Sequence, residues 1–314
     1  MKDRKAVFRF GSRSVVGLAD LALLVRAPAA LSVPGDVIAG AASVGRPTDI
    51  RTLGIVGSSV CLYWAGMALN DYADATVDAV ERPERPVPSG RVPRRAALGV
   101  AGGLTAVGLG LAAAAGGRRS LMGALPLAGL VWAYDLKLKS TPAGAAAMAG
   151  ARALDVLAGA LVPGPGAVST AEALRRGVVP AALVGIHTGT LMALSRHEIS
   201  GAPASVPVST LAVSAATALA AALPPGPRSA KAKPRVGLAA AGALAYLGTY
   251  GTAQARAVQE PSGHNIRRAV GAGILGLMPL QAALTARGGS PAVAAALGVV
   301  HPLARRLARR ISPT

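Results

Sequence analysis

Long apolar stretches alternate with short polar connections along almost the whole chain. A stretch of about 17–25 apolar residues can cross the hydrocarbon core of a bilayer as a helix. Such stretches are expected at residues 28–44, 52–70, 96–115, 120–135, 142–162, 178–194, 206–223, 236–253 and 269–286. The pattern therefore predicts an all-α, polytopic membrane protein with about nine transmembrane helices in a single bundle.

Residues 1–314 are expected to form one transmembrane domain with less apolar ends. Residues 1–27 are predicted to be a cytosolic or interfacial segment, in which residues 15–26 form a weakly amphipathic helix. Residues 291–303 are apolar but too short for a further span, and residues 287–314 form a basic tail. No cleavable signal peptide is expected, because polar and proline residues interrupt the first apolar stretch.

The composition supports a membrane protein and argues against a nucleic-acid-binding one. Charged residues make up 15% of the chain, against about 25% in soluble domains. The net charge is +19, but the basic residues occur in short groups between apolar stretches, as they do beside anionic headgroups. We therefore expect the lipid bilayer as a partner and no nucleic acid, and the sequence indicates no protein partner.

The second apolar stretch ends in Asn70-Asp71-Tyr72-Ala73-Asp74-Ala75-Thr76-Val77-Asp78. On a continuous helix Asp71, Asp74 and Asp78 would share one face. Carboxylates this close repel one another unless a cation lies between them. Mg²⁺ prefers oxygen ligands and binds through a few carboxylates together with substrate phosphates. Asn70, Asp71, Asp74 and Asp78 are therefore the predicted metal ligands.

Basic residues follow the aspartates directly. Arg82, Arg85 and Arg91 lie in a proline-rich segment and are predicted to bind phosphate oxygens, since arginine does so in bidentate fashion. With nine spans, the connections after the second, fourth, sixth and eighth lie on one side of the membrane. That side would also hold Tyr134, Lys137 and Lys139 after the fourth span, together with Arg196 and Glu198 after the sixth, and we expect it to face the cytoplasm.

The string from Asn70 to Arg91 resembles the first aspartate-rich motif of the UbiA superfamily of intramembrane prenyltransferases. The resemblance implies a nine-helix bundle, with Asp71, Asp74 and Asp78 as catalytic residues. It further implies Mg²⁺ as cofactor, a prenyl diphosphate as donor, and substrate contacts from Asn70, Tyr134 and the basic residues near them. A second acidic motif is expected after the sixth helix, where this chain has Ser195-Arg196-His197-Glu198. That segment holds one carboxylate, so the carry-over to Arg196 and Glu198 as catalytic residues departs from the family pattern.

Three charged residues fall inside predicted spans, where a charge is costly unless it is paired or functional. Asp36 is placed either in the protein interior or at headgroup depth. Arg152 and Asp155 are three residues apart and can pair with each other, either as a structural pair or as substrate contacts. We include Asp36, Arg152 and Asp155 among the candidate substrate-binding residues.

The predicted function is Mg²⁺-assisted transfer of a polyprenyl group from a prenyl diphosphate to an aromatic or other lipophilic acceptor, in a cell membrane of bacterial type. One alternative keeps the fold without catalysis, as a lipid-binding or pathway protein, because the second motif is degenerate. A multi-span transporter is the other alternative, and it leaves the string from Asn70 to Arg91 unexplained.

Overall fold

The computed structural model describes residues 16–164, 166, 168–223 and 233–299. Parts of the expected N-terminal segment and of the basic tail therefore lie outside the described residues. Every regular element in the described part is helical, which confirms the all-α prediction. The elements are α1 (Leu18–Leu24), η1 (Ala27–Ser32), α2 (Pro34–Ser43), α3 (Ile50–Ala73), α4 (Ala75–Glu81), α5 (Arg94–Ala133), η2 (Tyr134–Leu138), α6 (Gly144–Ala160), α7 (Thr170–Ser195), α8 (Ser205–Ala222), α9 (Lys233–Tyr246), η4 (Leu247–Gly251), α10 (Thr252–Gln259) and α11 (Gly263–Gly288).

Five helical stretches in the described residues are long and apolar enough to cross a membrane. They are Ile50–Ala73, Arg94–Leu138, Thr170–Ser195, Ser205–Ala222 and Gly263–Gly288. The predicted count of nine is not confirmed. Helices α2, α6 and α9 lie in the same bundle but are shorter, at 10, 17 and 14 residues.

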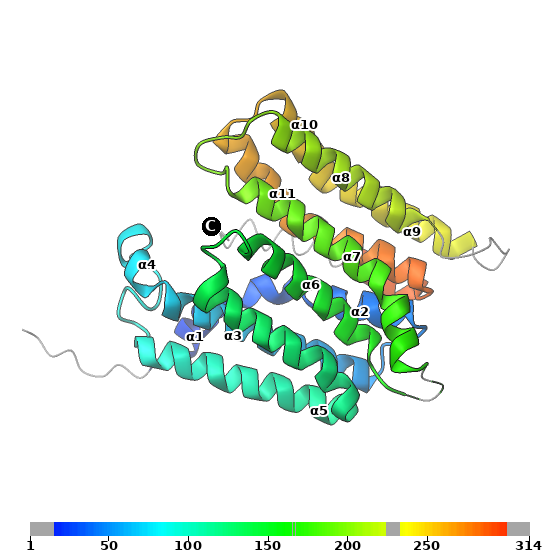
Figure 1. The fold of residues 1–314 in the computed structure, drawn as a ribbon, viewed down its shortest axis with the longest axis horizontal. Coiled ribbons are helices and arrows are strands. Elements are labelled where there is room, and N and C mark those ends of the chain that lie inside the picture. Colours follow the sequence, from blue (N-terminus) through cyan, green and yellow to red (C-terminus); the bar gives the residue numbers. More distant parts are fainter. Residues whose placement is uncertain (1–15, 165, 167, 224–232, 300–314) are drawn as a thin grey trace, which may run out of the picture.

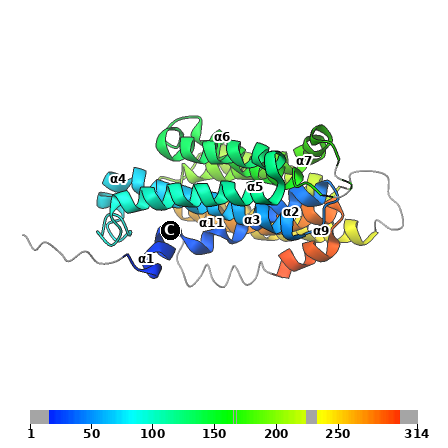
Figure 2. The ribbon, with the colours of Figure 1, turned by 90° about the horizontal axis from the view of Figure 1, so that it is seen from below.

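The longest of these stretches is folded back on itself, as Figures 1 and 2 show. Gly116 and Gly117 have non-helical backbone angles in the middle of α5, and Gly117 has a φ of +57°. Glycine adopts this left-handed conformation at little cost. The two halves correspond to the predicted spans at residues 96–115 and 120–135, with the reversal where those spans were expected to be joined.

The start of α7 differs from its prediction. The predicted span starts at residue 178, but the helix begins at Thr170, where the Ser169 hydroxyl accepts a hydrogen bond from the Glu172 backbone N–H. A serine N-cap of this kind stabilises the first turn. Glu172 in turn pairs with Arg175 and Arg176, so this polar sequence is a charged first turn rather than a loop.

Small residues let the helices approach closely at the centre of the bundle. Gly40 of α2 lies against the Val156 backbone of α6, and Gly159 of α6 lies against the Val37 carbonyl of α2. A side chain at either glycine would overlap backbone atoms of the facing helix. Such contacts are typical of membrane helices, whose packing relies on close backbone approach.

The connections that were predicted to share one side do lie at one end of the bundle. Figure 1 places the end of α3 with α4, the η2 segment, the α7–α8 connection and the α10–α11 connection at the left end of the molecule. The start of α9 lies at the other end, as Figure 2 also shows. The charged chemistry is therefore concentrated at the α4 end.

Candidate functional site

The aspartate motif spans a break between two helices. The motif does not lie on one continuous helix, because α3 ends at Ala73 and α4 begins at Ala75. Asp74 lies between them with φ −90° and ψ 7°. Short polar side chains favour such interruptions because they compete for backbone hydrogen bonds. The aspartates form two groups, and the first group joins residues from both sides of the break.

The first group joins Asp71 and Asp78 through arginines. Arg85 Nη1 lies 2.6 Å from Asp78 Oδ2 and 3.6 Å from Asp71 Oδ1, so one guanidinium bridges the two carboxylates. Arg26 Nη2 lies 2.9 Å from Asp71 Oδ1, and Arg82 Nη1 lies 3.4 Å from Asp78 Oδ1. Both aspartates are buried. Burial lowers the pKa of the Arg26 guanidinium, and the neighbouring Asp71 offsets part of this effect.

The second group surrounds Asn70. Its Nδ2 donates to Asp74 Oδ2 at 3.2 Å and to Asp135 Oδ1 at 3.3 Å. Lys139 Nζ lies 2.6 Å from Asp74 Oδ1. Asp135 is buried and belongs to the π-helical segment η2, a rare conformation that recurs at functional sites. The connections after α3 and α5 therefore meet at this point.

The described residues contain no group of three or more His, Cys, Asp or Glu side chains arranged to hold a metal ion. Asp71, Asp74 and Asp78 each face a basic side chain instead. The donor atoms available are carboxylate and amide oxygens, which is the chemistry that Mg²⁺ prefers. The residues therefore fit Mg²⁺ by donor type, with arginine and lysine as the present neighbours of those oxygens.

Other predicted site residues lie around this centre with fewer contacts. Arg91 is half exposed and pairs with Asp20 at 3.3 Å. Tyr134 is partly buried, and Lys137 is exposed two positions before Lys139. The predicted phosphate contacts of Arg91 and Lys137 stay predictions.

The segment after α7 lies at the same end but packs elsewhere. The Glu198 carbonyl accepts a hydrogen bond from Arg267 Nη2 at 3.1 Å, which ties this segment to the start of α11. Burial raises the pKa of the Glu198 carboxyl, and Arg267 offsets part of this shift. Arg196 is exposed and forms no ion pair with any residue that the structure describes. No described ion pair or hydrogen bond joins Arg196 or Glu198 to the aspartates.

A second polar cluster lies in the interior of the bundle. Arg152 Nε of α6 lies 2.9 Å from Asp36 Oδ2 of α2, and both residues are buried. Gln281 Nε2 of α11 donates to Asp36 Oδ1 and to the Ser32 carbonyl, each at 2.7 Å. The structure thus places Asp36 in the protein interior and not at headgroup depth. Three helices far apart in sequence thus meet at one carboxylate.

Asp155 does not form the ion pair that its spacing from Arg152 suggested. Arg152 turns to Asp36, while Asp155 accepts a hydrogen bond from the Ser59 hydroxyl of α3. Asp155 Oδ2 has no hydrogen-bond partner among the residues that the structure describes, and the Arg152 guanidinium carbon lies 5.2 Å from the Tyr63 ring centroid. Packing between helices has overridden the contact within α6.

One short element connects the two clusters. Arg26, just before η1, binds Asp71, and Ser32, the last residue of η1, accepts hydrogen bonds from Gln281 and from Arg152. Six residues of 3₁₀-helix rise about 12 Å. The aspartate end and the interior cluster are therefore about one short helix apart.

Sequence reasoning missed three residues of these clusters. Asp135 stands beside Tyr134 on the connection already assigned to the charged side, so its position was a usable signal. Arg26 was visible as a charge at the end of an interfacial segment. Gln281 had no signal, since nothing in a single apolar stretch shows that its amide faces Asp36.

The fold and the motif agree with comparisons to known proteins. The family model described as the UbiA prenyltransferase family matches residues 32–258, which is most of the chain. The chain belongs to the UbiA prenyltransferase family. The family prediction from the string between Asn70 and Arg91 is thus confirmed. An integral membrane protein follows from the family together with the apolar helices.

Two relatives of this chain carry the same enzyme name. Digeranylgeranylglyceryl phosphate synthase of Ignicoccus hospitalis is 35% identical over 179 residues, which is 57% of this chain and 56% of that protein. The synthase of the same name from Methanopyrus kandleri is 44% identical over 108 residues, 34% of this chain and 39% of that protein. The chain thus aligns with between about two fifths and just over half of these relatives.

Two solved UbiA homologues share the fold. The structure of a homologue from Aeropyrum pernix, without ligand, has a TM-score of 0.61 at 18% identity, covering 87% of this chain and 97% of that one. A homologue from Archaeoglobus fulgidus bound to DMAPP and Mg²⁺ has a TM-score of 0.56 at 16% identity, covering 82% and 99%. These similarities support the UbiA fold for this chain.

Proposed function

We propose that this protein is a membrane prenyltransferase that moves a prenyl group from an allylic diphosphate to a lipid acceptor. The observation that carries the proposal is the α3–α4 end, where three aspartates and their basic partners lie within a UbiA fold. A homologue of this fold was solved with DMAPP and Mg²⁺. Alternating acidic and basic side chains suit a magnesium diphosphate, which presents both charges.

Asp71, Asp74 and Asp78, with the Asn70 amide, would hold Mg²⁺, which when bound neutralises the diphosphate and makes it a better leaving group. Arg26, Arg85 and Lys139 are already within 3 Å of these carboxylates. Displaced from them, the same side chains would bind phosphate oxygens through charge-assisted hydrogen bonds. Arg82 and Arg91 stand at the exposed rim for a first contact with the anion.

We propose a lipid glyceryl phosphate as the acceptor, which is one of the lipophilic acceptors that the sequence allows besides aromatic ones. Support comes from the relatives, whose name describes a glyceryl phosphate carrying two geranylgeranyl groups. In the reaction the allylic C–O bond to the diphosphate breaks, and the diphosphate leaves with the electron pair. The acceptor hydroxyl oxygen forms the new C–O bond, and its proton passes to the departing diphosphate.

The interior cluster would line the path of the acceptor. Asp36, Arg152 and Asp155 are buried polar groups that end about one short helix away from the diphosphate end. Asp155 Oδ2 is free to accept a hydrogen bond from a hydroxyl. The surrounding apolar helices exclude water, which would otherwise capture the allylic cation.

The test uses the purified full chain in lipid nanodiscs. Labelled allylic diphosphates of increasing length are supplied with geranylgeranylglyceryl phosphate or with phenolic acceptors, in Mg²⁺ or in EDTA. We expect Mg²⁺-dependent ether product with the glyceryl phosphate. Asp74→Asn should abolish formation of this product. The matched control Glu172→Gln also removes one carboxylate, but in the first turn of α7, and should leave product formation unchanged.

The results separate the proposal from its alternative. A non-catalytic lipid-binding protein is favoured by the second motif, in which exposed Arg196 lacks an acidic partner among the described residues. That protein would bind prenyl diphosphate without releasing diphosphate in any acceptor mixture. Absence of both binding and turnover would refute the prenyltransferase proposal outright.

A further inference from the structure

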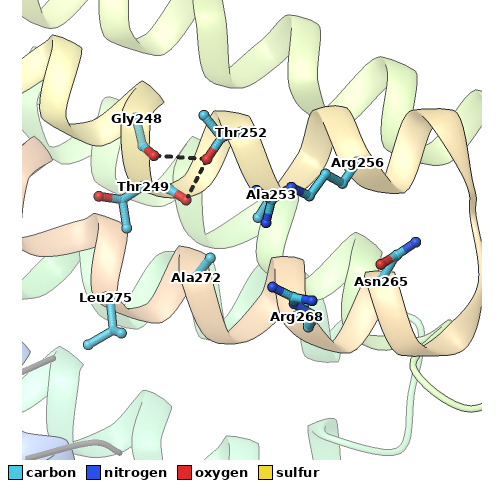
Figure 3. Close-up of a pocket in the computed structure, with 9 residues that line it drawn as sticks. All are labelled: Gly248, Thr249, Thr252, Ala253, Arg256, Asn265, Arg268, Ala272 and Leu275. Atoms are coloured by element: carbon cyan, nitrogen blue, oxygen red, sulfur yellow. Dashed lines mark hydrogen bonds between the residues drawn. The ribbon is translucent and has the colours of Figure 1, made fainter. Parts of the chain in front are cut away.

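A groove between two helices carries a pair of arginines that have no acidic partner among the described residues. It lies between η4 with α10 on one side and the first half of α11 on the other, and its volume is about 330 Å³ (Figure 3). Arg256 comes from α10 and Arg268 from α11. Both side chains are exposed, so the groove opens on the outer surface of the bundle.

The charges around the groove are not balanced. Neither Arg256 nor Arg268 forms an ion pair with a residue that the structure describes. The nearby acid, Glu260, accepts a hydrogen bond from Asn265 Nδ2 at 3.2 Å, and Arg267 is directed to the Glu198 carbonyl instead. Two guanidinium groups with no carboxylate between them attract an anion, and their planar donors match phosphate oxygens.

Arg256 and Arg268 are the only charged residues among the described residues that line the groove. Ala272 and Leu275 line it one and two turns beyond Arg268 on α11. Gly248 lines the opposite wall two turns before Arg256, and a Cβ there would meet no atom within 4 Å. Thr249 and Thr252 line this half as well, and their hydroxyls donate to the Ala245 and Gly248 carbonyls of their own helical turns. The groove is therefore charged near the α10–α11 connection and uncharged for about 10 Å along the helices beyond it.

The charged and uncharged parts of the groove lie at the depths of the headgroups and the acyl chains of a membrane leaflet. Helix α11 is a candidate span that begins at Gly263, so Arg268 lies about one and a half turns inside its end. That is headgroup depth, where basic pockets between transmembrane helices bind anionic lipids. Leu275, further along α11, lies at the depth of the acyl chains.

The groove is separate from the two clusters described above. Leu275 and Gln281 of α11 are six residues apart, which places their side chains about 120° apart around the helix axis. Gln281 faces Asp36 in the interior. No residue lining the groove pairs with the aspartate motif or with Arg152.

We propose that this groove binds an anionic membrane phospholipid. Its phosphate lies between Arg256 and Arg268, and its chain lies against Gly248, Ala272 and Leu275. The proposal is independent of the prenyltransferase function, because the groove shares no residue with that site. A free phosphate anion would use the same arginines but would gain nothing from contact with Ala272 and Leu275.

The experiment measures lipid retention on the full chain by native mass spectrometry. The protein is released from phosphatidylcholine nanodiscs that contain a small fraction of phosphatidylglycerol. Each arginine beside an anionic headgroup contributes about fivefold to binding, so Arg256→Gln with Arg268→Gln should weaken phosphatidylglycerol retention about thirtyfold. The charge-matched control is Arg95→Gln with Arg118→Gln, two exposed arginines elsewhere, and should retain the lipid as the wild type does.

Three results would overturn the proposal. They are equal retention by the groove variant and the wild type, equal loss in the control, and displacement of the lipid by inorganic phosphate at a comparable concentration. The single variants Arg256→Gln and Arg268→Gln should each show about a fivefold effect, which guards against a folding defect in the pair. Substitution of Leu275 by Asp should weaken phosphatidylglycerol retention without changing the response to inorganic phosphate.

Discussion

Replacing Arg152 with methionine should destabilise the protein severely. The substitution keeps an unbranched, flexible side chain but removes the cation 2.9 Å from Asp36 Oδ2. Asp36 is 0% exposed, and Asp155 on the same helix is also 0% exposed. Removing one partner of a buried ion pair leaves an uncompensated charge and costs about 3–5 kcal/mol.

A double-mutant cycle tests which carboxylate Arg152 stabilises. Adding Asp36→Asn to Arg152→Met should recover most of the loss, because a neutral buried pair is tolerated and Gln281 can still donate to Asn Oδ1. Adding Asp155→Asn should recover less, since the Ser59 hydroxyl already satisfies one Asp155 oxygen. The coupling energy should therefore be larger for Arg152 with Asp36 than for Arg152 with Asp155.

Cys61 supplies the assay, because it is the single cysteine of the chain and lies partly buried on α3. A thiol-reactive dye reports unfolding as the detergent-solubilised protein is heated. Arg152→Met should lower the apparent melting temperature by on the order of 10 °C. Arg175→Met, an exposed arginine of α7, is the control. Stronger coupling to Asp155 than to Asp36 would refute the pairing described here.

Three further predictions concern the ends and the centre of the bundle. Lys139→Gln should weaken prenyl diphosphate binding about fivefold to tenfold, because it removes the cation beside Asp74. Lys137→Gln, two residues away and exposed, should change this binding little. A titration with a non-hydrolysable diphosphate analogue compares the two variants. Gly159→Ala should destabilise the fold by roughly 1–3 kcal/mol, because the added methyl group would overlap the Val37 carbonyl. Gly189→Ala is the control, since its added Cβ would meet no described atom within 4 Å. The same melting assay should show little change for this control. Because burial raises the pKa of Glu198, the folded state holds its proton more tightly, so wild-type stability should fall as the pH rises through the ordinary carboxyl range. Glu198→Gln should remove that fall, and an equal slope in both proteins would show that another group is responsible.

Much of the fold was predictable because membrane helices depend on length and hydrophobicity, which a single sequence displays. The reversal at Gly116 and Gly117 and the gathering of four connections at one end followed from that pattern. The number of spans did not follow from hydrophobicity alone, since α2 and α6 are shorter helices that pack between their neighbours.

The site was predictable where the signal was local in sequence and unpredictable where it depended on packing. The aspartates and Arg85 occur in one string, and the structure brings them together. Arg152 had two possible carboxylate partners, and only the crossing of α2 with α6 decides for Asp36. The role of Gln281 depends likewise on a contact between residues far apart in the chain.

The ion pairs of the aspartate motif have a thermodynamic consequence for ligand binding. Asp71, Asp74 and Asp78 each have a basic partner, in Arg26, Lys139 and Arg85, so the resting charges of these three pairs cancel. A diphosphate that arrives alone adds only negative charge, and a divalent cation alone must compete with the basic side chains for the carboxylates. Each ligand supplies the charge that the other requires, so their binding affinities should be linked, and by the same factor in both directions.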